Sequence, residues 1–157
     1  MVSSARLRLC IGMVSMLALT SNASEEVPPD SYLINSGREI FQLHCAACHD
    51  ETTEGTKNWK RPNDRGEMPP PPHGPEGHTW RHSDAMLQRM ISQGWRDPFN
   101  KTQRLTMPAF QKVLTPKEIE AVITYLKTLW TTEQRQFQRQ ENQARSHNST
   151  QTELLDK

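Results

Sequence analysis

The chain has 157 residues, enough for one domain, and its 19 basic and 18 acidic side chains give a formal net charge of +1. Such a balance gives no sign of strong binding to nucleic acid. Only 34% of the residues are hydrophobic and the mean hydropathy is −0.80, so side chains alone offer little apolar surface to offset the conformational entropy lost on folding.

Residues 1–23 have the features of a secretory signal peptide. Arg6 and Arg8 form a basic start, residues 9–19 form an apolar run, and residues 21–23 (Ser-Asn-Ala) resemble a small-residue cleavage site. The apolar run is short for a permanent membrane helix. We therefore expect an exported, periplasmic protein that contacts the membrane only if the signal is retained as an N-terminal anchor.

The mature chain is expected to begin with a flexible lead over residues 24–35. A first helix is then predicted from Ser36, which forms a capping-box pattern with Glu39, and this helix runs into Cys45. Residues 36–130 would form one domain.

Two further helices follow in the predicted order. A proline-rich loop over residues 50–82 comes first, with short helical turns expected within it. A helix then covers about 83–93, with Ser83 as its cap and Gly94 as its stop. A second loop, over residues 95–114, leads to the last helix of the domain.

The last helix has the clearest signals in the chain. Thr115 and Glu118 form a capping box around Pro116, and apolar residues recur at helical spacing as far as Trp130. The polar tail, residues 131–157, is expected to continue this helix as an exposed rod to about residue 144 and to be disordered from 146. Because no segment alternates apolar and polar residues as a strand does, the predicted fold is all-α.

The sequence Cys45-Ala46-Ala47-Cys48-His49 is the attachment signature of a c-type haem. Two thiols three positions apart can each form a thioether with one haem vinyl group, and His49 then binds the iron. A zinc module built from Cys45, Cys48, His78 and His82 is a poor alternative, because the gap before His78 is too long for a finger. A thioredoxin-like site would need a βαβ pattern, which is missing.

Together these segments resemble a class I monohaem cytochrome c over residues 36–130. The resemblance is carried by Gly37 and Phe41, the haem motif, the segment 107–110 (Met-Pro-Ala-Phe) and the terminal helix. It implies a few helices around one covalent haem c, with Gly37 and Phe41 of the first helix meeting Tyr125 or Leu126 of the last. It also implies that a proline carbonyl accepts a hydrogen bond from His49, with Pro62 or one of Pro69–Pro72 as the candidates.

Met107 is the predicted second axial ligand of the iron. It lies in a loop, Pro108 stiffens its backbone, and a thioether ligand raises the reduction potential as an electron carrier requires. The rivals are Met68, Met86, Met90, His78 and His82, of which Met86 and Met90 fit a plain helical core better.

Several other side chains could serve the haem or a metal. The haem propionates could be bound by an indole N–H or a guanidinium, and the candidates are Trp59, Trp80, Trp95 and Arg81. His73, His78 and His82 could also form a copper or zinc site.

The predicted function is electron transfer rather than enzyme catalysis. With His49 and Met107 both bound, the iron has no open position for a substrate, and the partners would be redox proteins such as an oxidase, a reductase or a dehydrogenase. The alternative is a haem protein with an open or displaceable distal site, for ligand sensing or peroxide chemistry.

Overall fold

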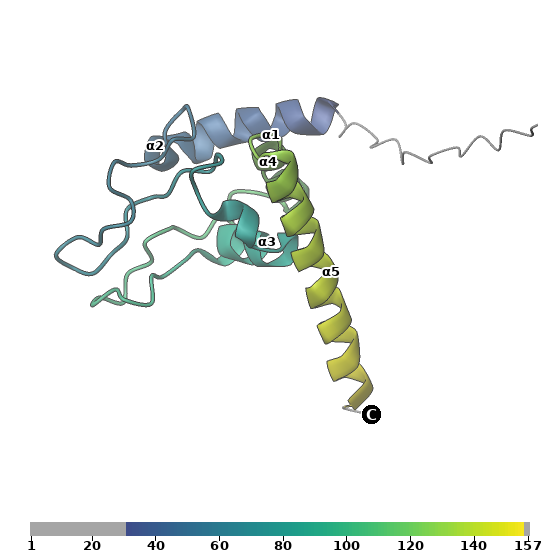
Figure 1. Ribbon diagram of the computed structural model, residues 1–157. Helices are drawn as coiled ribbons and strands as arrows, with labels where there is room; N and C mark the ends of the chain where they lie inside the picture. Colours follow the sequence, from purple (N-terminus) through teal and green to yellow (C-terminus); the bar gives the residue numbers. More distant parts are fainter. Residues whose placement is uncertain (1–30, 156–157) are drawn as a thin grey trace, which may run out of the picture.

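The computed structural model describes residues 31–155, with side chains as far as residue 145 (Figure 1). The predicted signal peptide and the start of the predicted lead lie outside the described residues. The elements in chain order are α1 (Ser31–His44), α2 (Ala46–His49), the 3-10 turn η1 (Thr79–Arg81), α3 (Asp84–Gln93), α4 (Pro116–Thr128) and α5 (Thr132–Leu155). Residues 31–155 contain no strand, only one isolated antiparallel bridge between Trp95 and Met107, so the all-α prediction is confirmed.

Helix α1 begins at Ser31, before the predicted start at Ser36. Its apolar face extends back to Ile34, which packs on the core one turn before Gly37 and two turns before Phe41. The prediction of a flexible lead was therefore wrong for residues 31–35, and Ser36 lies inside the helix instead of capping it.

Helices α1 and α4 cross at very close range (Figure 1). A Cβ atom placed on Gly37 would lie 2.0 Å from the backbone oxygen of Ala121, so only glycine allows this approach. Beside it, the fully buried ring of Phe41 lies 5.6 Å from the ring of Tyr125. The expected meeting of Gly37 and Phe41 with the terminal helix is confirmed.

The predicted caps of α3 and α4 are present. The Ser83 hydroxyl accepts a hydrogen bond from the Met86 amide, and α3 ends at Gly94. At the start of α4, the Thr115 amide donates to the Glu118 carboxylate (2.7 Å) and the Glu118 amide donates to the Thr115 hydroxyl (3.3 Å). The predicted short turn in the proline-rich loop also exists, as η1.

Helix α4 does not continue into the tail, contrary to prediction. It ends at Thr128, and Trp130 then turns into the core, where it is 3% exposed and its indole N–H donates to the His73 carbonyl (3.0 Å). A second capping box follows, because the Thr131 amide donates to the Gln134 side chain and the Gln134 amide donates to the Thr131 hydroxyl.

Helix α5 is not the exposed rod that we expected, although its far half extends beyond the body of the domain (Figure 1). Gln138 is 2% exposed and donates a 2.6 Å hydrogen bond to the Asp84 carboxylate, which also pairs with Lys127 of α4 (2.7 Å) and accepts from Asn142. The helix extends to Leu155, beyond the predicted end near residue 144, and residues 156–157 lie outside the described residues.

None of the helices within residues 31–155 has the length and apolar character needed to cross a bilayer.

Candidate haem site

A cavity of about 350 Å³ lies between the haem motif, α3, α4 and three loops. Most of its wall is apolar, with Phe41, Leu87, Ile91, Val122 and Leu126 among the lining residues. The predicted site residues meet here, because its lining also includes Cys45, Cys48, His49, Met68, His78, His82 and Met107.

The two cysteines lie at the single turn of α2, and both carry free thiols. Cys48 is exposed and Cys45 is half-buried. Burial, and secondly the neighbouring Cys48, raises the pKa of the Cys45 thiol to about 11. In the folded chain this thiol is therefore neutral near pH 7.

His49 is 8% exposed, and its Nδ1–H donates a 2.9 Å hydrogen bond to the Pro71 carbonyl. Burial lowers the pKa of His49, with the Pro71 bond acting in the opposite direction, so the ring is neutral. An imidazole oriented through Nδ1 keeps Nε2 available for a metal. The expected proline carbonyl is therefore that of Pro71, one of the candidates in the Pro69–Pro72 run.

The backbone of Met107 is fixed from two sides. The Trp95 amide donates to the Met107 carbonyl (2.9 Å), and the Met107 amide donates back to the Trp95 carbonyl (3.0 Å). Gly94, at φ +78°, lies so close that a Cβ there would be 2.7 Å from the Met107 carbonyl oxygen. The sequence suggested Gly94 only as a helix stop, since its contact with a residue 13 positions later leaves no local pattern.

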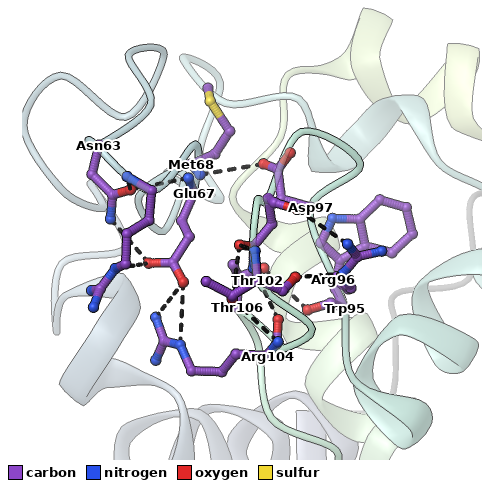
Figure 2. A network of polar contacts seen from close by, with 11 residues as sticks. Asn63, Glu67, Met68, Trp95, Arg96, Asp97, Thr102, Arg104 and Thr106 are labelled. Atoms are coloured by element: carbon purple, nitrogen blue, oxygen red, sulfur yellow. Dashed lines mark hydrogen bonds and ion pairs between the residues drawn. The ribbon is translucent and has the colours of Figure 1, made fainter.

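Met68 lies on the other long loop, where its amide donates to the Asp97 carboxylate (3.3 Å; Figure 2). This is a single bond to a side chain. Its backbone is therefore less firmly held than that of Met107. Met90 of α3 also lines the cavity.

A buried carboxylate links the two loops that carry Met68 and Met107 (Figure 2). The Glu67 side chain is 5% exposed, accepts from Asn63 (3.0 Å) and pairs with Arg104 (2.8 Å) and Arg65 (3.2 Å). The Asn63 bond first, and the Arg104 bond second, lower the pKa of Glu67. No sequence motif pointed to this cluster, because Arg104, which completes it, lies on the other loop 37 residues along the chain.

The propionate candidates proposed from the sequence differ in their surroundings. The Trp80 indole N–H is used by the Gly77 carbonyl (3.1 Å), and the exposed Arg81 guanidinium lies over the Trp80 ring, 4.8 Å from its centroid. Trp59 and Trp95 line the cavity, and Trp59 stacks on the His78 ring at 5.4 Å.

The copper and zinc sites considered as alternatives from the sequence do not form among the described residues. Among the described residues there is no group of three or more His, Cys, Asp or Glu side chains placed to bind a metal ion. His73 instead shares a 2.9 Å hydrogen bond between its Nδ1 and the Thr79 hydroxyl. This agrees with the preference for a haem over the three-histidine site and over the zinc module of Cys45, Cys48, His78 and His82.

The residues around the cavity fit a covalently attached haem. The wall is apolar, two free thiols and a neutral imidazole meet at one side, and two loop methionines reach the lining.

Comparison with known proteins agrees with this fit. The sequence model of the family described as Cytochrome c matches residues 34–130. Two curated proteins named Cbb3-type cytochrome c oxidase subunit FixP are similar: one from Bradyrhizobium sp. (strain ORS 278), 29% identical over 120 residues, and one from Sinorhizobium medicae (strain WSM419), 24% identical over 123.

These alignments include 74% and 75% of this chain but only 38% of each relative, so the chain spans well under half the length of either. The family match covers more than half of this chain and includes the haem motif. The chain therefore belongs to the cytochrome c family, as an electron-transfer protein with a covalently bound haem c.

Proposed function

We propose that the protein is a one-electron carrier and not an enzyme, with Cys45 and Cys48 as the haem thioethers and His49 and Met107 as the axial ligands. The haem supplies an iron that alternates between Fe(II) and Fe(III). The residues of the chain attach it, fill both axial positions and exclude water.

The two axial side chains have distinct tasks in this proposal. His49 is neutral and oriented by its bond to Pro71, which leaves Nε2 as the donor atom to the iron. The Met107 thioether is a soft ligand that stabilises Fe(II) and raises the reduction potential. With both positions filled, the iron offers no open site to a substrate.

The observation that carries the assignment of Met107 is its fixed backbone in the wall of the cavity that His49 also lines. An axial ligand that keeps its place in both oxidation states minimises rearrangement during electron transfer. Two reciprocal bonds to Trp95 and the close contact with Gly94 give Met107 that rigidity, whereas Met68 has one 3.3 Å bond to Asp97.

Electrons would enter and leave at the haem edge beside Cys48, the more exposed of the two cysteines. The relatives are by name oxidase subunits, which supports an oxidase-type redox partner, with a reductase or dehydrogenase on the other side. We place this exchange in the periplasm, with a membrane association only if residues 1–23 are retained.

The test compares Met107→Ala with Met68→Ala in protein matured in a host that attaches haem. Visible spectra of the oxidised and reduced forms are recorded with and without carbon monoxide, and the midpoint potential is measured. Met107→Ala should abolish the weak long-wavelength sulfur-to-iron band, bind carbon monoxide when reduced and lower the potential. Met68→Ala, the matched control, should keep the wild-type band.

Reversal of the two results would assign Met68 as the ligand. Carbon monoxide binding by the wild type would contradict a closed electron carrier and favour the alternative with a displaceable distal site. Protein without haem bands would contradict the attachment at Cys45 and Cys48.

A further inference from the structure

A second histidine lies directly against the predicted proximal ligand. The rings of His49 and His73 have centroids 4.1 Å apart and planes only 33° apart, so the two imidazoles are stacked close to face to face. Both residues line the cavity. The function proposed above gives no task to His73, although its ring contacts the group that is expected to bind the iron.

Contacts from four separate parts of the chain hold His73 itself in place. Its Nδ1 shares a 2.9 Å hydrogen bond with the hydroxyl of Thr79 in η1, and the Phe41 ring of α1 meets it edge to face, with centroids 5.8 Å apart. The His73 amide donates to the Thr53 carbonyl (2.9 Å), and the His73 carbonyl accepts from the Trp130 indole (3.0 Å). The ring is therefore a fixed surface for its neighbour.

The backbone that joins the two supports of His49 is also held closely. Pro71 accepts the hydrogen bond from Nδ1 of His49, and His73 follows two positions later. Between them, the Pro72 backbone lies so near to Gly77 that a Cβ there would be 2.0 Å from the Pro72 oxygen. One short segment thus supplies a hydrogen-bond acceptor at the edge of the ligand ring and a stacking surface at its face.

The two supports constrain different motions of His49. A single hydrogen bond fixes the tautomer but tolerates a range of angles, so it restrains the plane of the ring only loosely. A neighbouring ring packed on one face opposes rotation of that plane, because the atoms of the two rings would then overlap. Both rings are neutral, since burial lowers the pKa of His49 and of His73, so no charge repulsion separates them.

We propose that His73 is a positioning residue for the proximal ligand: its ring, stacked on His49, sets the plane of the imidazole that binds the haem iron. The proposal rests on His49 as an axial ligand under the proposed function, but not on which methionine binds opposite. His73 acts through His49 and does not bind the iron itself. Supporting groups of this kind keep a metal ligand in one geometry.

The plane of an axial imidazole has an electronic consequence for a ferric haem. Only the iron d orbital that overlaps the π system of the ring shares its unpaired electron with it, so the direction of the plane selects that orbital. A fixed plane gives one electronic state, whereas a plane that rotates gives a mixture. The stacked His73 therefore keeps the ferric haem of this protein in a single state.

The test compares His73→Leu with His73→Phe in the oxidised holoprotein. Leucine removes the flat ring, whereas phenylalanine keeps a stacking surface and loses the hydrogen bond to Thr79. Ile119→Ala is the control for a general loss of stability, since Ile119 is 2% exposed and is not among the residues that line the cavity. The haem-methyl shifts in the paramagnetic proton spectrum and the low-temperature electron paramagnetic resonance spectrum report the plane of the axial imidazole.

In His73→Leu we expect an altered spread of the four haem-methyl shifts and a broader low-field resonance signal, because the His49 plane is no longer held. His73→Phe should keep most of the wild-type pattern, and Ile119→Ala should keep all of it while lowering the thermal midpoint. A wild-type pattern in His73→Leu would overturn the proposal. Equal changes in the leucine and phenylalanine variants would also overturn it, because the hydrogen bond to Thr79 and not the stacking would then be responsible.

A measurement on the wild type covers the case in which His73→Leu does not fold. In the reduced, diamagnetic holoprotein, the ring protons of an iron-bound His49 are shifted to high field by the porphyrin and should show nuclear Overhauser effects to the ring protons of His73. High-field His49 protons without this contact would refute the stacking and leave the proposed function intact. His49 protons without the high-field shift would instead contradict its ligation of the iron, and with it both proposals.

Discussion

At the scale of single residues, the site depends on groups that hold the predicted axial ligands in position without binding the iron themselves. Pro71 orients His49 through a 2.9 Å hydrogen bond, and Gly94 allows the Met107 backbone to approach Trp95. Neither Pro71 nor Gly94 lends a side-chain atom to the iron. Their effect is to limit the positions that the axial side chains can adopt.

Gly94→Ala should loosen the distal side of the haem. The new Cβ would lie 2.7 Å from the Met107 oxygen and 2.9 Å from the Ala109 amide nitrogen, and φ of +78° strains any other residue. We expect a cost of about 1–3 kcal/mol in the free energy of unfolding. The sulfur-to-iron band should weaken and the reduced protein should gain partial carbon monoxide binding.

Gly74→Ala is the control for that substitution. Apart from the two residues next to it in the chain, no atom of the described residues would lie within 4 Å of a Cβ at Gly74, so the spectrum and stability should match the wild type. Equal behaviour of the two variants would show that the Gly94 contact does not support Met107.

Glu67→Gln should destabilise the protein in a pH-dependent manner. Hydrogen bonds from Asn63 and Arg104 lower the pKa of Glu67 in the folded state, so ionised Glu67 stabilises the fold above its unfolded pKa of about 4.3. This stabilisation is lost as the pH falls through the folded pKa.

The thermal midpoint of Glu67→Gln should therefore lie a few degrees below that of the wild type at pH 7, and the two midpoints should approach each other as the pH falls below the unfolded pKa of about 4.3. Melting curves across this range are the measurement. The exposed Glu51, changed to Gln, is the control and should leave the midpoint unchanged. A constant difference at every pH would argue against the ionic role of Glu67.

At the scale of elements, α5 serves the haem site from a distance. It contacts η1 through Phe137 and Gln138, and α3 through the Asp84 carboxylate, so it fixes the wall that bears His78 and His82. The sequence predicted that the polar tail is exposed to solvent. In the structure, the first half of α5 packs on the domain and supports η1. The polar residues mislead because Gln138 and Asn142 are satisfied by Asp84 rather than by water.

Gln138→Ala tests this brace. The side chain is 2% exposed, and its loss leaves Asp84 without a 2.6 Å donor, which should cost about 1–3 kcal/mol in chemical denaturation of the holoprotein. Hydrogen exchange at the η1 amides should also accelerate. The exposed Gln136, changed to Ala, should do neither, and a similar effect of both variants would exclude a specific contact.

The sequence predicts those features of the helices that depend on contacts between residues close together in the chain. The caps at Ser83 and Thr115 were predicted because a side chain bonds to an amide three residues away. Thr131 and Gln134 form the same kind of cap. It was not predicted, because the apolar pattern that runs to Trp130 suggested one continuous helix through this point. The start of α1, the choice of Pro71 and the burial of Gln138 depend on residues distant in the chain, and no local pattern encodes them.

At the scale of the whole molecule, the haem completes the core. The buried apolar side chains around Phe41, Ile119 and Leu126 form one cluster. A cavity of about 350 Å³ lies beside this cluster, and Phe41 and Leu126 line it. A polar chain with few apolar residues has little else to fill that space. The cofactor is therefore part of the folding free energy as well as the functional group.

Removal of both attachment sites should expose this dependence. In Cys45→Ala/Cys48→Ala protein we expect no covalent haem in a pyridine haemochrome assay. Much of the far-ultraviolet helical signal should remain, while the near-ultraviolet signal and the cooperative thermal transition are lost. The Met107→Ala protein, which keeps the thioethers, is the comparison. A cooperative transition at the wild-type temperature would show that the chain folds without its haem.

The close crossing of α1 and α4 also affects the reactivity of a cysteine. The haem motif directly follows α1, and α1 packs on α4, which starts at Pro116. Burial raises the pKa of the Cys45 thiol to about 11 in the folded chain and so disfavours the reactive thiolate. An exposed thiol in an unfolded chain ionises more readily. Haem attachment through Cys45 is therefore easier before the chain has folded around this cysteine than afterwards.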